Sequence, residues 1–234
     1  FLGISRGELN DIVNHIQKEY KETRLPKKDG TYRSLCVPSI RLRFCQDPIK
    51  EKILPQLPVS KFATAYQKGS TTRGNAEPHI GKKFLLKLDI TDFFGSITFE
   101  QVQCAAFNTR YVSRQVGYLL TSLCCKDDSL PQGAATSPAL SNIVMYRFDD
   151  YIGRWCSQRQ IAYTRYCDDM TFSANRPLYG VYQKVKTMLR EMGFELNESK
   201  THFIGNDNRQ SVTGLVVNEK LSIPSGYKRD LRQG

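Results

Sequence analysis

Residues 163–173 read YTRYCDDMTFS, two short runs that meet at the acidic pair Asp168-Asp169. Aromatic and β-branched residues flank the pair, and strands favour such residues. A tight turn at this point would lift both carboxylates out of the sheet. The stretch therefore predicts a β-hairpin with two carboxylates at its tip, and an exposed acidic turn that binds nothing is the alternative.

Two other Asp-Asp pairs, at residues 127–128 and 149–150, show that the dipeptide alone carries little information. The pair at 168–169 differs because it lies in a predicted hairpin and has an acidic partner upstream. That partner is Asp89, which ends the largely apolar run FLLKL at residues 84–88.

An unpaired carboxylate buried in an apolar strand is costly. A hard cation with oxygen ligands removes that cost, and Mg²⁺ commonly uses one or two carboxylates together with substrate phosphates. We therefore predict that Asp89 and Asp168 bind divalent metal, with Asp169 as the weaker ligand.

The amino-acid composition indicates what kind of binding partner to expect. The 234 residues include 34 Lys and Arg against 23 Asp and Glu, a formal net charge of +11, with 12 Tyr and 12 Phe. Positive charge and aromatic rings together favour a phosphate-rich partner such as nucleic acid. No apolar run approaches the roughly 18–20 residues of a membrane span, so we expect no membrane partner. Seven cysteines without a C-x-x-C spacing indicate a reducing, cytoplasmic environment.

Helical and strand-like patterns mix without regular βαβ alternation, which predicts an α+β fold. Helices are expected over residues 5–23, 40–54, 98–107, 111–125, 137–157 and 178–192. Strands are expected over 32–37, as half of a basic hairpin, over 84–90, in the segment 163–173 and in short pieces within 194–218.

Several short elements occur in a fixed order. They are Asp89 with Asp92-Phe93-Phe94, Leu130-Pro131-Gln132-Gly133 with Ser137-Pro138, Tyr166-Cys167-Asp168-Asp169, and Gly193-Phe194 with Lys200. In this order they resemble the palm motifs of reverse transcriptases, and Arg33 with Leu35 and Pro38 resembles the first fingers motif. The resemblance implies a right-hand polymerase fold with an antiparallel-sheet palm and helical and hairpin fingers. It places fingers at 1–83 and 104–136, palm at 84–103 and 137–218, and the start of a truncated thumb at 219–234.

The resemblance also implies RNA-directed DNA synthesis with two Mg²⁺ ions. The metal site would comprise Asp89, Ile90, Asp168 and Asp169. Lys200 matches a lysine thought to protonate the leaving pyrophosphate, and a solvated lysine is the alternative.

Around the incoming deoxynucleoside triphosphate the resemblance places Lys27, Arg33, Asp92, Phe93, Phe94, Gln132 and Gly133. Phe94 matches the bulky residue that would clash with a ribose 2′-hydroxyl, with a core phenylalanine as the alternative. Arg33, with Lys27 or Lys28 in the hairpin before it, would clamp phosphates, which suits a planar guanidinium. Without the resemblance, Gln132-Gly133 is an ordinary turn.

A narrower resemblance is to retron reverse transcriptases, through Asn75-Ala76-Glu77-Pro78-His79 and Val212-Thr213-Gly214. It implies a bacterial enzyme that copies a structured non-coding RNA into RNA-linked single-stranded DNA, holds an RNA/DNA hybrid, and acts in phage defence with a possible effector protein. The residues it assigns to nucleic acid are Asn75, His79, Tyr166, Thr213 and Gly214. Alternatively, Asn75 and His79 only tie down a loop.

Two rival functions stay open from the sequence. One is another bacterial reverse transcriptase, such as a group II intron maturase or an abortive-infection type. The other is an RNA-binding scaffold whose polymerase site has lapsed.

Overall fold

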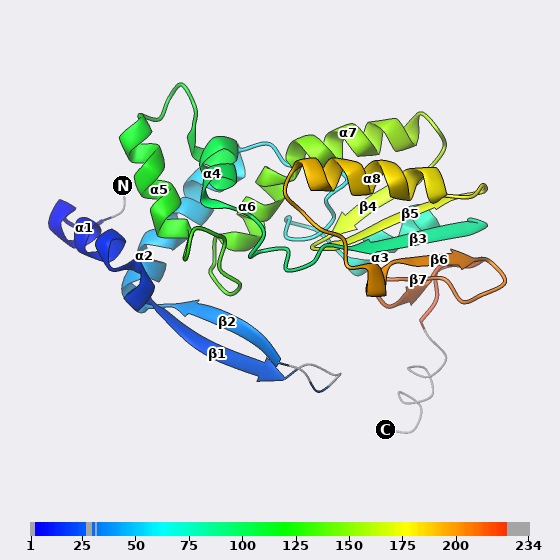
Figure 1. Cartoon of the computed structure of the whole chain (residues 1–234), viewed down its shortest axis with the longest axis horizontal. Coiled ribbons are helices and arrows are strands. Elements are labelled where there is room, and N and C mark those ends of the chain that lie inside the picture. The colour runs from blue at the N-terminus through cyan, green and yellow to red at the C-terminus, as the bar shows by residue number, and fades with distance from the viewer. Residues whose placement is uncertain (1–2, 27–29, 31, 224–234) are drawn as a thin grey trace. The chain divides into compact units, whose positions relative to one another are not determined.

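The computed structural model describes residues 3–26, 30 and 32–223. It divides the chain into two compact units. We call Phe1–Val59 with Asp92–Met145 the hairpin unit, and Ser60–Thr91 with Tyr146–Gly234 the sheet unit. Both contain helices and antiparallel strands (Figure 1), which confirms the predicted α+β class. The division into fingers, palm and thumb stays a prediction, and residues 224–234 of the predicted thumb segment lie outside the described residues.

The hairpin unit is mainly helical around one two-stranded hairpin. Its helices and strands are α1 (Arg6–Asn14), β1 (Tyr20–Pro26), β2 (Tyr32–Pro38), α2 (Ile40–Pro48), α4 (Phe99–Val102), α5 (Arg114–Cys124) and α6 (Ser137–Val144). The helix predicted over residues 5–23 is wrong beyond Asn14. Ser5 caps α1 together with Glu8, and a single 3-10 turn follows at Ile16–Glu19. Residues from Tyr20 onward pair with β2. Residues 21–24 are all polar, so a helix continued past Tyr20 would gain no apolar face to bury.

The sheet unit contains a four-stranded antiparallel sheet in the order β4-β5-β3-β6. Its elements are α3 (Thr72–Ala76), β3 (Phe84–Asp89), α7 (Tyr146–Ser157), β4 (Ala162–Tyr166), β5 (Asp169–Ala174), α8 (Tyr179–Glu191), β6 (His202–Gly205), β7 (Ser211–Val212) and β8 (Leu215–Val216). Helices α7 and α8 lie along one face of the sheet (Figure 1). The helix predicted over 137–157 is interrupted at Met145, where α6 ends.

Strand alternation assigns side chains to the two faces of this sheet. Leu85 packs with Ala76 and Val212 in a buried cluster on the side of α3 and β7. Asp89 lies four residues further along β3 and therefore shares that face. Leu86 and Phe172, opposite each other in the register, are buried on the α7–α8 face. The carboxylate of Asp89 thus lies on the face away from the two long helices.

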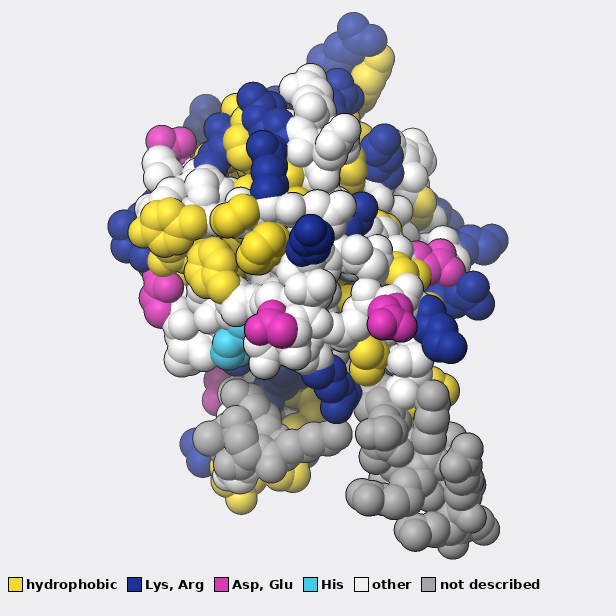
Figure 2. All heavy atoms as spheres, turned by 90° about the vertical axis from the view of Figure 1, so that its right-hand side faces the viewer, with side chains coloured by type: hydrophobic (Ala, Val, Ile, Leu, Met, Phe, Trp, Pro, Cys, Tyr) yellow, Lys and Arg dark blue, Asp and Glu magenta, His cyan; other side chains and the backbone are white. Residues whose placement is uncertain are grey.

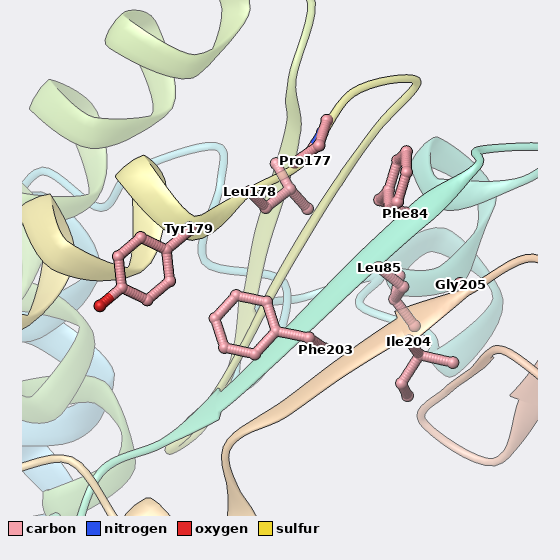
Figure 3. Close-up of a pocket in the computed structure, with 8 residues that line it drawn as sticks. All are labelled: Phe84, Leu85, Pro177, Leu178, Tyr179, Phe203, Ile204 and Gly205. Carbon is pink, nitrogen blue, oxygen red and sulfur yellow. The ribbon is translucent and has the colours of Figure 1, made fainter.

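An apolar pocket of about 320 Å³ lies on the sheet unit beside the start of α8. Phe84, Tyr179 and Phe203 contribute rings to it (Figure 3). Alternation puts Phe84 on the opposite face from Asp89. Figure 2 shows hydrophobic side chains gathered in a patch on the face in view, with Lys and Arg spread around it. Among the described residues, no helix has the length and apolar character needed to cross a bilayer.

Candidate active site

The acidic turn lies between β4 and β5. Tyr166 is opposite Asp169 in the register, so Cys167 and Asp168 form the two-residue connection. This confirms the hairpin predicted from the sequence. Cys167 has a φ of 60°, a left-handed conformation that costs a residue other than glycine on the order of 1–3 kcal/mol. The turn is therefore held by contacts around it.

The end of β3 meets this turn. Asp89 lies opposite Asp169 in the antiparallel register of β3 and β5, an arrangement that typically separates Cβ atoms by about 4.5–5.5 Å. The Ile90 N–H donates a hydrogen bond to the Asp168 carbonyl at 3.2 Å. The structure therefore brings Asp89 next to the acidic turn, although the two are far apart in the chain.

Lys200 also reaches this site. Its Nζ donates to Oδ2 of Asp89 at 2.8 Å; the Asp89 side chain is only 7% exposed and the Lys200 side chain is 58% exposed. The Asn197 N–H donates to the Asp89 carbonyl at 2.8 Å, which anchors the Lys200 turn to β3. The hydrogen bond to Asp89 raises the pKa of Lys200, so its ammonium group is protonated. The buried carboxylate thus has a cationic partner, which the sequence did not predict.

The electrostatics of the turn favour a bound cation. Partial desolvation, followed by the nearby charges of Asp168 and Asp89, raises the pKa of Asp169. In the part of the chain that the structure describes, no three His, Cys, Asp or Glu side chains form a group able to hold a metal ion as they stand. The chemistry of the donors still fits Mg²⁺, because it prefers carboxylate oxygens and would relieve the repulsion within this acidic set.

The predicted nucleotide-binding residues belong to the hairpin unit. Asp92 has a φ of 41° and its carbonyl accepts from the Ser96 N–H at 2.8 Å, which forms a turn. Phe93 is buried and Phe94 is partly exposed, with their ring centroids 5.7 Å apart. Of the two rings, only that of Phe94 offers a substantial accessible surface. Its role as a sugar gate stays a prediction.

Gln132 and Gly133 are tied to strand β2. The Cys36 N–H donates to the Gln132 carbonyl at 2.7 Å. Gly133 has a φ of 120°, and a Cβ there would lie 2.9 Å from the Cys36 carbonyl oxygen. The backbone geometry alone therefore requires glycine at this position. Arg33 is exposed on β2, and Lys27 lies outside the described residues.

The two retron-like elements contact each other in the sheet unit. Nδ2 of Asn75 donates to Oγ1 of Thr213 at 3.4 Å, and Thr213 donates to the Thr72 carbonyl at 3.0 Å. Thr213 and Gly214 have φ values of 44° and 83°, as the two-residue turn between β7 and β8 requires. Asn75 is buried, whereas Gly214 is exposed. This geometry favours the alternative in which Asn75 orders a loop.

His79 is fully buried against the neighbouring strands β4 and β5. Its Nδ1 lies 2.7 Å from Oγ of Ser173 and its Nε2 lies 2.9 Å from Oγ1 of Thr164. Burial lowers the pKa of His79 to about 3. The imidazole is therefore neutral near pH 7 and fixes the segment before β3 to the sheet.

We expect acid to destabilise the protein through His79. The unfolded chain protonates this residue near pH 6.5, whereas the folded state keeps it neutral to about pH 3. The contribution of neutral His79 to the free energy of unfolding is thus fully present above pH 6.5. It is lost as the pH decreases towards 3, by at most about 1.4 kcal/mol per pH unit. Urea unfolding between pH 7 and 5 should show this slope in the wild type.

The control for His79 uses the exposed His202 on β6. His79→Asn should start from a lower stability and lose this part of the pH dependence, whereas His202→Asn should keep it. Equal slopes for His79→Asn and the wild type would contradict the assignment.

Two residues that the sequence did not single out support the turn. Arg165 in β4 and Asp149 in α7 form an ion pair of 2.6 Å, with both side chains fully buried. The sequence feature that could have identified Arg165 is a lone arginine in a strand of aromatic and β-branched residues, three positions before Asp168. The Asp149 partner could not be recognised, because the pair 149–150 reads as the polar face of a helix.

Comparisons with known proteins agree with this arrangement. The family described as "Reverse transcriptase (RNA-dependent DNA polymerase)" matches residues 25–217. Retron Ec83 reverse transcriptase of Escherichia coli is 34% identical over 90% of this chain and 72% of its own length. Retron Ec86 reverse transcriptase of E. coli is 33% identical over 93% of this chain, and retron Mx65 reverse transcriptase of Myxococcus xanthus is 32% identical over 99%. The chain spans 66% and 60% of the lengths of the last two.

Solved structures share the fold. Telomerase from Candida albicans, in complex with a fragment of telomeric RNA, has a TM-score of 0.61 at 12% identity and covers 90% of this chain and 48% of its own. Apo telomerase from Candida tropicalis, truncated from its C-terminal domain, has a TM-score of 0.58 at 13% identity, with coverages of 93% and 59%. The predicted right-hand polymerase fold is therefore confirmed. The chain belongs to the reverse transcriptase family and is of the retron type.

Proposed function

We propose that this chain carries out RNA-directed DNA synthesis. The observation that carries the proposal is the placement of Asp89 opposite Asp169 and beside Asp168, within a chain of the reverse transcriptase family. In the reaction, a primer hydroxyl attacks the α-phosphate of a deoxynucleoside triphosphate. A new P–O bond forms as the bond to pyrophosphate breaks.

The residues of the site have distinct parts in this proposal. Asp89, Asp168 and Asp169, with the neighbouring Ile90, would hold two Mg²⁺ ions, which when bound neutralise charge on the attacking and leaving oxygens. Lys200 is protonated and its side chain is largely exposed, so it can release Asp89 and give a proton to the pyrophosphate. The protein's remaining contribution to the reaction rate is to align the primer hydroxyl with the nucleotide.

The experiment uses the purified chain, a primer annealed to an RNA template, and labelled deoxynucleotides. We expect incorporation with Mg²⁺ and none after EDTA. No incorporation in either condition, together with retained RNA binding, would support the scaffold with a lapsed site instead.

A more specific part of the proposal is that the template copied by the chain is a structured non-coding RNA. The resemblance of residues 75–79 and 212–214 to retron elements, the retron relatives and the formal charge of +11 support it. The product would be DNA joined to RNA, made in the bacterial cytoplasm and used in phage defence, with a possible effector protein.

Sequencing the nucleic acid that co-purifies with the chain tests the product, because a branched RNA–DNA joint is diagnostic. Phage plating on cells with wild-type protein and Asp168→Asn tests the defence role.

Phe94→Ala should weaken discrimination against ribonucleotides. Removal of the ring would leave room for a 2′-hydroxyl, and we expect the preference for deoxynucleotides to fall by about 10-fold to 100-fold. Single-nucleotide incorporation with matched ribo and deoxy substrates measures the ratio of kcat/KM values.

The control for Phe94 is Phe99→Ala. Phe99 is another partly exposed phenylalanine of the hairpin unit, and it packs against Tyr118. Its removal should leave the preference unchanged. An unchanged preference in Phe94→Ala would instead make Phe94 a core residue.

A further inference from the structure

A buried ion pair lies behind the acidic turn, on the face of the sheet that α7 covers. Nε and Nη2 of Arg165 donate to the two carboxylate oxygens of Asp149 at 2.6–3.1 Å. The Tyr163 hydroxyl donates to the same carboxylate at 2.7 Å. Arg165 and Asp149 are each 0% exposed. These contacts fix the guanidinium in one orientation.

The remaining edge of this guanidinium contacts the turn itself. Nη1 of Arg165 donates to the Cys167 carbonyl at 2.8 Å. Cys167 is the residue with the left-handed φ of 60°, and its carbonyl carbon is bonded to the nitrogen of Asp168. The hydrogen bond therefore opposes relaxation of the peptide that sets the direction of the acidic pair.

The main chain of Arg165 is fixed as well. Its N–H donates to the Phe62 carbonyl and its carbonyl accepts from the Thr64 N–H, both at 2.8 Å. Ala63 between them bridges to Arg165 in parallel orientation. The guanidinium thus extends from a backbone that is held on both sides, and it can act as a rigid support.

We propose that Arg165, oriented by Asp149 and Tyr163, is a positioning residue that holds the turn carrying Asp168 and Asp169 in its metal-binding geometry. The inference rests on the proposed function, because that function gives the turn its ligands. A buried ion pair contributes little net stability compared with well-packed apolar residues. Stability alone therefore does not explain the pair, whereas alignment of a strained turn does.

The test separates alignment from stability with a charge-free variant, Asp149→Leu/Tyr163→Phe/Arg165→Met. This variant leaves none of the three side chains with an unpaired polar group, so we expect it to fold with a melting temperature close to that of the wild type. The turn nevertheless loses its donor. We expect Mn²⁺ binding, followed by electron paramagnetic resonance without nucleotide, to weaken about 10-fold to 100-fold. The kcat for incorporation should fall by about 100-fold, with KM for the deoxynucleotide nearly unchanged.

Two further variants complete the design. Arg165→Lys keeps the charge but cannot reach Asp149 and the Cys167 carbonyl together, so it should also weaken Mn²⁺ binding, and it decides the question if the triple variant does not fold. The control is Asp150→Leu/Arg154→Met, which removes the more exposed pair of α7 and should change none of the readouts.

The outcomes are distinct. Wild-type Mn²⁺ affinity and kcat in a folded triple variant, or in Arg165→Lys, would overturn the inference. A wild type that neither binds Mn²⁺ nor incorporates nucleotides would instead overturn the proposed function on which the inference rests.

Discussion

Asp168→Asn should reduce nucleotide incorporation by on the order of 10³-fold. The substitution keeps the shape of the side chain and removes the negative charge that would hold the metal ions. Asp168 lies in the turn beside Asp89, and its carbonyl accepts the Ile90 N–H through a main-chain contact that asparagine preserves. The fold should therefore remain, and single-turnover incorporation on an RNA template measures the loss.

RNA binding separates a chemical defect from a binding defect. The variant loses one negative charge, so its affinity for RNA should stay the same or rise slightly. Asp128→Asn is the matched control, because it makes the same change in another Asp-Asp pair, in a turn of the hairpin unit where Asp128 has a φ of 57°. That variant should retain full activity. Retained synthesis in Asp168→Asn would reject the metal assignment.

The acidic hairpin was predictable because its determinants are local. Aromatic and β-branched residues on both sides of Asp168-Asp169 favour strands, and the observed register closes a two-residue connection at that place. The end of β3 at Asp89 was predictable for the same reason. The sequence also suggested Asp89 as a partner of the acidic turn, but not its position opposite Asp169, because strand pairing between distant segments is set by tertiary packing.

The errors arose where local pattern and tertiary contact disagree. The segment from Tyr20 to Pro26 forms a strand because β2 supplies hydrogen-bond partners along its length. Its own charged residues fit a solvated helix equally well. Lys200 was expected at the site only by resemblance, and its ion pair with Asp89 depends on the anchoring of Asn197 to the end of β3.

The pair Asp149-Asp150 illustrates the limit of sequence pattern most clearly. Both residues lie on α7, yet Asp149 is buried against Arg165, whereas Asp150 pairs with the exposed Arg154. Adjacent helical residues point about 100° apart, so one turned towards the sheet while the other remained near solvent. Nothing in the dipeptide shows which of the two is buried.

Asp149→Leu should destabilise the protein by about 3–5 kcal/mol, because it leaves the Arg165 guanidinium charged and buried without its counter-ion. Leucine is larger than aspartate, so no cavity forms, and the loss reflects the unpaired charge together with some overpacking of the buried site. Typical stabilities are about 5–15 kcal/mol, and we expect a large decrease in the urea midpoint or insoluble protein. Equilibrium unfolding at pH 7 gives the value.

Asp150→Leu provides the comparison at the next residue of the same helix. Its ion pair with Arg154 is partly exposed, and such pairs contribute about 0–1 kcal/mol, so this variant should unfold close to the wild type. A loss below about 1 kcal/mol in Asp149→Leu would show that water reaches Arg165 and that the pair is not buried in solution. The guanidinium would then be too mobile to fix the Cys167 carbonyl, and the support for the acidic turn would have to come from elsewhere.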